Sequence, residues 1–216
     1  MEGASRLFDA IRLDHFRAFA SYWAVPAGAK TAREGAWEQG PGMDLLGVLT
    51  SWFPQITYIA EDLGILTEDV HRLRKDSGLP GMKVLEFAFS GPDNAYLPHQ
   101  YPDSRCICYT GTHDNDTAAG WYASATPQEK AYARKYLGVE RDDAQTVCRA
   151  LLRAGQGSIA ELFVAQMQDY LGLGSEARVN VPGVPRGNWS WRMEPGKTTD
   201  ALADAIRDLT HTFGRC

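Results

Sequence analysis

Three carboxylates in the chain stand at positions from which they could act together on a substrate. Asp14, Glu61 and Asp114 each follow a segment whose apolar and β-branched residues predict a strand. The carboxyl ends of parallel strands meet at one edge of a sheet, and α/β enzymes gather their functional groups there. We therefore expect a site that contains these three side chains.

The residues leave three kinds of chemistry open, namely metal binding, cleavage of glycosidic bonds and purely structural ion pairing. Residues 14–15 and 113–116 offer histidine and aspartate ligands for a metal, but their spacing fits no familiar metal motif. Arg12 and Arg17 beside Asp14 would also repel a cation. We therefore assign no metal site.

Glycosidic chemistry assigns different roles to the carboxylates. Cleavage with retention needs an ionised nucleophilic carboxylate and a protonated carboxylic acid, ~5 Å apart across the bond. Arg12 favours the ionised form of Asp14, whereas the apolar strand that precedes Glu61 favours a retained proton. Asp114, next to His113, could then bind sugar hydroxyls and stabilise a cationic transition state.

The elements that must position these residues alternate between strands and helices. A strand is predicted where the first apolar run leads into Ile11–Arg17, which carries the charged residues. Further strands are predicted at 56–60, 81–89, 105–110 and 178–181. Helices are predicted at 43–53, 67–77 with Thr67 as the cap, 117–122, 127–137, 141–154, 158–170 and 199–213. Residues 26–42 and 188–192 are expected to be loops that carry tryptophan. This alternation predicts an α/β fold with a parallel sheet.

The composition is that of an ordinary globular domain. The chain has 216 residues, 44% of them hydrophobic and 23% charged, with a formal net charge of −5. An acidic surface disfavours nucleic acid and anionic membranes as partners, so we expect neither and favour a neutral ligand. Six tryptophans and nine tyrosines suit stacking on sugars, although most such rings fill a core.

The cysteines and the start of the chain indicate a reducing compartment. Cys106 and Cys108 share one face of a predicted strand without the spacing of a zinc site, and we expect them, Cys148 and Cys216 to be reduced. No charged and apolar leader follows Met1, and no apolar run reaches the ~20 residues of a membrane span. We expect a cytoplasmic location.

Three blocks of sequence, in order, resemble the catalytic motifs of the 4-alpha-glucanotransferases, also called amylomaltases or disproportionating enzymes, in the alpha-amylase clan. They are R-L-D-H-F-R at 12–17, A-E-D-L-G at 60–64 and T-G-T-H-D-N-D-T at 110–117. Further similar blocks lie at 22–32, 37–42, 78–89, 96–101 and 188–192. The similarity spans nearly all of the chain.

The resemblance implies an enzyme that cuts an alpha-1,4 bond of a maltooligosaccharide or of a starch-type or glycogen-type glucan and transfers the fragment to another glucan or to glucose. It implies that Asp14 is the nucleophile, Glu61 the general acid/base and Asp114 the stabiliser of the transition state. Arg12 and His113 would contact the substrate, with Trp23 and Trp37 as sugar platforms or packing residues. No cofactor is implied. An amylase-type hydrolase and a non-catalytic glucan-binding fragment are the alternatives.

The resemblance also implies a (β/α)8 TIM-type barrel, of which this chain holds only the second half. We expect residues 1–216 to be the C-terminal catalytic part of a single barrel domain, with about strands 4 to 8 and their helices. A missing N-terminal portion of the same enzyme would then be a partner, because a partial barrel exposes strand edges and apolar faces.

Overall fold

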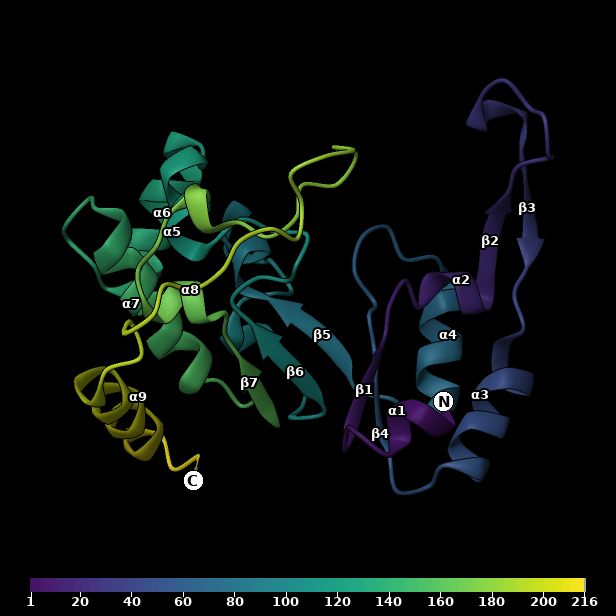
Figure 1. The fold of residues 1–216 in the computed structure, drawn as a ribbon, viewed down its shortest axis with the longest axis horizontal. Helices are drawn as coiled ribbons and strands as arrows, with labels where there is room; N and C mark the ends of the chain where they lie inside the picture. The colour runs from purple at the N-terminus through teal and green to yellow at the C-terminus, as the bar shows by residue number, and fades with distance from the viewer. Residues whose placement is uncertain (216) are drawn as a thin grey trace. The chain divides into compact units, whose positions relative to one another are not determined.

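The computed structural model describes residues 1–215, which fall into two compact units, with the second beginning at Lys83 (Figure 1). Each unit has its own hydrophobic core. The core of the first unit includes Phe16, Leu46 and Val70, and that of the second includes Leu85 and Leu151. The two halves of the predicted site belong to different units.

The first unit, residues 1–82, combines a parallel strand pair with helices. Its elements are α1 Glu2–Ser5, β1 Ala10–Leu13, α2 Arg17–Ala20, β2 Ser21–Ala24, a 3-10 turn Ala32–Glu34, β3 Ala36–Gln39, α3 Gly42–Trp52, β4 Thr57–Ala60 and α4 Glu68–Ser77. Strands β1 and β4 pair in parallel, with Leu13 beside Ala60. Their carboxyl ends therefore lie side by side, as the sequence predicts.

The segment predicted as a loop at 26–42 instead forms half of a β-hairpin. Strands β2 and β3 pair antiparallel, with Trp23 opposite Trp37, and the hairpin projects from α2 in Figure 1. The two rings contact edge to face, 5.4 Å apart and inclined by 72°. Such aromatic pairs across strands stabilise a hairpin, which explains why this glycine-rich segment is ordered.

The second unit packs helices against a three-stranded sheet in the order β5-β6-β7. Its elements are β5 Gly81–Val84, which starts at the end of the first unit, the 3-10 segments Leu85–Ser90 and Pro98–Gln100, β6 Cys106–Tyr109, α5 Ala118–Ser124, α6 Pro127–Leu137, α7 Ala144–Gln156, β7 Leu162–Val164, α8 Met167–Tyr170, a 3-10 turn Ser175–Ala177 and α9 Asp200–Thr212. The core between them contains Cys108 of β6, Tyr122 of α5 and Leu151 of α7.

Most predicted elements are confirmed, but three predictions besides the loop at 26–42 are wrong. The strands at 56–60 and 105–110 and the helices at 43–53, 67–77 and 127–137 are found within a few residues, although the Thr67 side chain makes no capping hydrogen bond. The predicted strand 81–89 ends at Val84 and continues as a 3-10 segment. The predicted helix 158–170 contains β7 and α8, and the predicted strand at 178–181 is not formed.

Some side chains that the sequence predicts to be buried are exposed. Leu7 and Phe8, in the apolar run before β1, are 75% and 59% exposed, so the buried strand begins later than predicted. Cys106, Cys108 and Cys148 are buried and form no disulfide among the described residues, whereas Cys216 lies outside them. Among residues 1–215, no helix has the length and apolar character needed to cross a membrane.

Candidate active site

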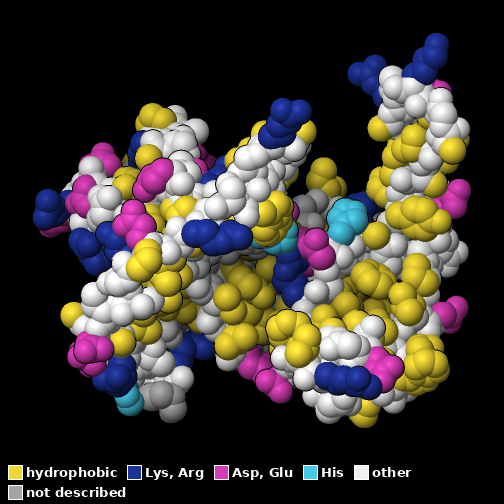
Figure 2. Space-filling model, in the orientation of Figure 1, with side chains coloured by type: hydrophobic (Ala, Val, Ile, Leu, Met, Phe, Trp, Pro, Cys, Tyr) yellow, Lys and Arg dark blue, Asp and Glu magenta, His cyan; other side chains and the backbone are white. Residues whose placement is uncertain are grey.

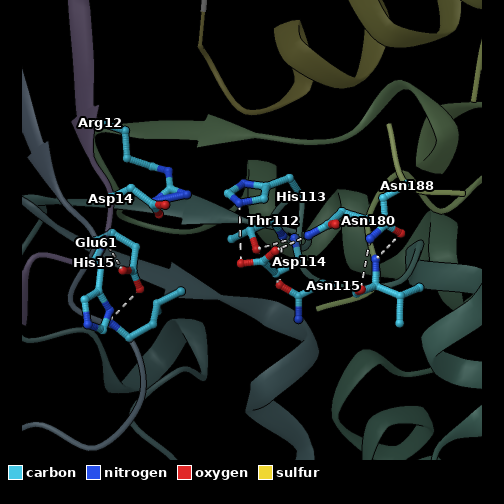
Figure 3. Close-up of polar contacts among 12 residues, drawn as sticks. Arg12, Asp14, His15, Glu61, Thr112, His113, Asp114, Asn115, Asn180 and Asn188 are labelled. Atoms are coloured by element: carbon cyan, nitrogen blue, oxygen red, sulfur yellow. Dashed lines mark hydrogen bonds and ion pairs between the residues drawn. The ribbon is translucent and has the colours of Figure 1, made fainter. Parts of the chain in front are cut away.

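The first half of the site is built on the carboxyl ends of β1 and β4. Asp14 follows β1 directly and Glu61 follows β4 directly, so the parallel pairing brings both residues to the same edge. The Glu61 carboxylate accepts hydrogen bonds from the backbone N–H of His15, at 2.7 Å, and of Leu63, at 3.2 Å (Figure 3). His15 adopts a φ of 50°, which turns its N–H toward this carboxylate.

The surroundings of Glu61 favour its protonated form. Burial is the largest effect and raises the pKa of Glu61, and the charge of Asp14 adds to the rise. The two backbone hydrogen bonds and the positive charge of Arg12 oppose it without cancelling it. The direction agrees with the sequence argument, and a carboxyl that keeps its proton closer to neutral pH is suited to general acid catalysis.

Asp14 is held by an arginine but stays open to solvent. Arg12 Nη1 donates to Asp14 Oδ1 at 2.6 Å, and the side chains of Arg12 and Asp14 are 21% and 66% exposed. The predicted pairing is therefore present. A paired carboxylate with two-thirds of its side chain accessible is reachable by a ligand.

The two tryptophans predicted to contact the substrate lie together on the hairpin. Trp23 and Trp37 are 42% and 55% exposed, so much of each ring is accessible. The indole N–H of Trp23 donates to the carbonyl of Ala32 at 2.7 Å, and the guanidinium of Arg17 lies 4.5 Å from the centre of the Trp37 ring. Arg17 thus covers one face of Trp37, and a sugar could stack only on surface that these contacts leave open.

The predicted site residues of the other unit lie in the loop of residues 110–117, which follows β6. Asn115 Oδ1 accepts hydrogen bonds from the backbone N–H and the hydroxyl of Thr112, both at 2.9 Å (Figure 3). This closed turn fixes the backbone on both sides of His113 and Asp114. His113 Nε2 lies 3.4 Å from Asp114 Oδ2, so the two predicted site residues of this unit are brought together.

Sequence reasoning missed a segment that holds Asp114. Asn180 Nδ2 donates to Asp114 Oδ1 at 2.5 Å, and Arg178 Nη2 donates to the Asp114 carbonyl at 2.6 Å. Trp189 stacks on His113 with ring centres 5.4 Å apart. Asn188 closes the intervening turn by accepting from the Val181 N–H and donating to the Val181 carbonyl (Figure 3). The tryptophan-bearing loop was noticed in the sequence, but its link to Asp114 was not.

The buried Asp169 and the half-buried Asp116 hold the same loop in place. Asp169, only 1% exposed, accepts from the Thr110 hydroxyl at 2.5 Å and from the Ala118 N–H at 2.8 Å. Asp116 accepts from the Ser175 hydroxyl at 2.6 Å. Each of these carboxylates therefore has hydrogen-bond partners that stabilise its position.

The metal alternative gains no support from the side-chain arrangement. In the part of the chain that the structure describes, no group of three His, Cys, Asp or Glu side chains could hold a metal ion. The geometry instead consists of carboxylates that are individually paired with arginine, amide or backbone donors.

Comparison with known proteins places the chain in a family. A family model described as 4-alpha-glucanotransferase matches residues 1–199. The 4-alpha-glucanotransferase of Thermus thermophilus is 50% identical over 220 residues, which cover all of this chain and 44% of that protein. A chloroplastic/amyloplastic 4-alpha-glucanotransferase of Arabidopsis thaliana is 44% identical over 98% of this chain and 37% of its own length.

A solved structure of an amylomaltase has a similar fold. Amylomaltase from Streptococcus agalactiae in complex with acarbose superposes with a TM-score of 0.91 at 31% identity, over 99% of this chain and 43% of that one. The protein is thus an α/β protein of the amylomaltase fold. The chain belongs to the 4-alpha-glucanotransferase family, and it spans less than half the length of these relatives.

Proposed function

We propose that the chain carries the catalytic carboxylates of a 4-alpha-glucanotransferase that acts by a retaining double displacement. The observation that carries the proposal is that two carboxyl groups stand at neighbouring strand ends in a member of this family: Asp14, bonded to Arg12, and Glu61, whose pKa is raised by burial. The two environments suit the two roles that this mechanism assigns to its carboxyl groups.

In the first step, the Glu61 carboxylic acid gives its proton to the glycosidic oxygen as the bond from that oxygen to C1 breaks. The Asp14 carboxylate bonds to C1, and the released glucan leaves with a free 4-hydroxyl. In the second step, the 4-hydroxyl of an acceptor sugar attacks C1 and the bond to Asp14 breaks. The hydroxyl proton returns to Glu61, which restores both carboxyl groups.

The other predicted residues take supporting roles in this proposal. Asp114, oriented by Asn180 and Arg178, would stabilise the positive charge that develops on the sugar ring. Arg12 would hold the Asp14 carboxylate in place, and His113 would contact a sugar hydroxyl. Trp23 and Trp37 would offer exposed ring surface to the glucan.

The substrates in this proposal are maltooligosaccharides or starch-type and glycogen-type glucans. Acarbose bound to the related Streptococcus agalactiae amylomaltase supports a glucan-like ligand. Neither nucleic acid nor a membrane is proposed as a partner. A cytoplasmic location stays a prediction from the sequence.

We also propose that the chain is the second half of a (β/α)8 barrel and that a further portion of the enzyme covers the apolar side of the first unit. Helix α3 exposes Trp52 and Val48, which line a hollow together with Leu49 and Phe53. Figure 2 shows hydrophobic side chains gathered over the unit that contains α1 to α4. Exposed apolar surface of this kind is typical of an interface.

Incubation with maltotriose tests the function directly. Glucose together with products longer than maltotriose would establish transfer, whereas glucose and maltose alone would establish the amylase-type alternative. Binding of maltotriose without turnover would identify a non-catalytic fragment. Thin-layer or ion-exchange chromatography of the products separates these outcomes.

The nucleophile is tested by Asp14→Asn. The amide cannot form the covalent bond to C1, so we expect turnover to fall at least about 1,000-fold while the free energy of unfolding changes little, because Asp14 is exposed. Asp76→Asn on α4 makes the same exchange at an exposed site of the same unit and should keep turnover unchanged. Full activity of Asp14→Asn would remove Asp14 from the mechanism.

A further inference from the structure

Glu86 is a buried acid that the proposed chemistry does not use. It stands in the 3-10 segment Leu85–Ser90 between the fully buried Leu85 and the exposed Phe87, and it is itself only 6% exposed. Its Oε1 atom is buried and has no hydrogen-bond partner among the described residues. A carboxyl group in such a place is costly, so its position calls for a physical role.

The Glu86 side chain packs directly behind the loop that carries Asp114. The backbone N–H of Glu86 donates to the Thr110 carbonyl at 3.2 Å. A Cβ atom added to Gly111 would lie only 2.7 Å from Glu86 Oε1, so the carboxyl occupies the space that a side chain at position 111 would need. Any movement of Glu86 is therefore transmitted to the 110–117 loop.

Acidic and basic groups face Glu86 from several elements. Asp169 of α8 and Asp116 of the loop are the anions that act on Glu86, Cys148 of α7 is also within its electrostatic reach, and Arg178 is the cation that acts on it. Burial is the main reason that the pKa of Glu86 rises to about 9, and the two aspartates add to the rise while Arg178 opposes it. At neutral pH, Glu86 is thus an uncharged acid.

Arg178 links this buried acid to Asp114. Its Nε donates to the Asn180 carbonyl at 2.8 Å, and its Nη2 donates to the Asp114 carbonyl at 2.6 Å. If Glu86 were ionised, its charge would attract the same guanidinium, because a buried carboxylate requires a cation or several hydrogen-bond donors. Movement of the guanidinium toward Glu86 would disturb its hydrogen bond to the Asp114 carbonyl.

We propose that Glu86 is a positioning residue for Asp114. As an uncharged acid it fills the space behind Gly111 and leaves Arg178 bonded to the Asp114 carbonyl, and its ionisation pulls Arg178 away and shifts the loop. The effect on the loop is independent of any reaction, whereas its effect on turnover rests on the proposed function.

The ring of His113 reports on the loop, because it contacts both Asp114 and Trp189. Long-range proton–nitrogen NMR spectra resolve the five histidine rings of the chain, and the loss of one set of signals in His113→Gln assigns this ring. We expect the His113 signals of the wild type to shift with a midpoint near pH 9. The shift should be absent in Glu86→Gln and present in Glu140→Gln, which makes the same exchange at an exposed residue of the same unit.

Two results would overturn the proposal, namely a wild-type His113 ring that shows no transition near pH 9, or the same transition in Glu86→Gln. Where maltotriose is turned over, kcat/KM should fall by about tenfold per pH unit as Glu61 ionises and more steeply near pH 9, with the steeper part missing in Glu86→Gln. Equal slopes in both proteins would refute the effect on turnover. Absence of turnover would refute the proposed function and leave the NMR result to decide the role of Glu86.

Discussion

Replacing Glu86 with glutamine should stabilise the protein, and by an amount that grows with pH. The pKa of Glu86 rises from its ordinary 4.5 to about 9 on folding, mainly through burial. Below pH 4.5 the acid is uncharged in the folded and the unfolded state, so its ionisation does not change the free energy of unfolding. Between 4.5 and 9 the unfolded chain releases the proton and the folded chain retains it, so the free energy of unfolding falls by about 1.4 kcal/mol per pH unit.

At pH 7 the accumulated loss in free energy of unfolding is about 3 kcal/mol. Above pH 9 this loss becomes constant, because Glu86 is then ionised in both the folded and the unfolded state. Glutamine has nearly the same shape and does not ionise, so the difference in free energy of unfolding between Glu86→Gln and wild type should increase steadily from pH 5 to pH 8. The slope is a better test than the absolute value, since burying the amide adds a cost that does not vary with pH.

Urea unfolding at several pH values measures this difference. Glu140→Gln provides the control and should follow the wild type, because residue 140 is exposed. If the difference for Glu86→Gln grows by less than about 0.3 kcal/mol per pH unit, the carboxyl is not held uncharged and the reasoning about its surroundings fails.

Two further variants test the packing and the site. Gly155→Ala would place a Cβ 2.1 Å from the Phe163 ring, so we expect a loss of about 1–3 kcal/mol in free energy of unfolding despite the better helix propensity of alanine. Gly47→Ala, where a Cβ meets nothing within 4 Å, should instead stabilise by up to about 1 kcal/mol, and equal effects in thermal unfolding would refute this packing argument. Asn180→Ala removes a hydrogen bond to the Asp114 carboxylate and should lower kcat/KM on maltotriose about 10-fold to 100-fold; an unchanged value would show that Asn180 does not orient Asp114.

Local sequence signals predicted those elements whose boundaries are set locally. Helix α6 begins and ends as predicted because Thr126 and Glu129 form a reciprocal capping box and Pro127 occupies the first turn. Gly138 then ends the helix with a φ of 66°, a conformation that glycine adopts readily. Each of these interactions joins residues close in sequence, so the pattern of types was sufficient.

Elements defined by distant pairing were predicted poorly. The three residues of β7 lie in a segment with helical spacing, and they are extended because they pair with β6, with Ile107 beside Leu162. Phe163 also packs on the bare backbone of Gly155 in α7. Nothing in the local sequence reports that contact, since tertiary packing overrides intrinsic preference in short segments.

The hairpin was missed for a related reason. The glycines and prolines between 26 and 42 correctly exclude a long helix, but two short strands need a partner before they can be recognised. The alternation on either side is brief, and the pairing of Trp23 with Trp37 becomes visible only when the register is known. The sequence leaves both tryptophans open as sugar platforms or packing residues, and the structure shows that they contact each other and are 42% and 55% exposed.

The candidate site shows the same division between local and distant information. Asp14, Glu61 and Asp114 could be found because each follows a strand, and the pairing of Arg12 with Asp14 spans two positions. Arg178, Asn180 and Glu86 act on the Asp114 loop from distant segments, so no spacing rule points to them. One signal was present for Glu86, because a lone acid between Val84-Leu85 and Phe87-Ala88-Phe89 must be buried beside apolar neighbours. An acid with such neighbours is either paired or uncharged. Because the Oε1 atom of Glu86 has no hydrogen-bond partner among the described residues, we infer that Glu86 is uncharged.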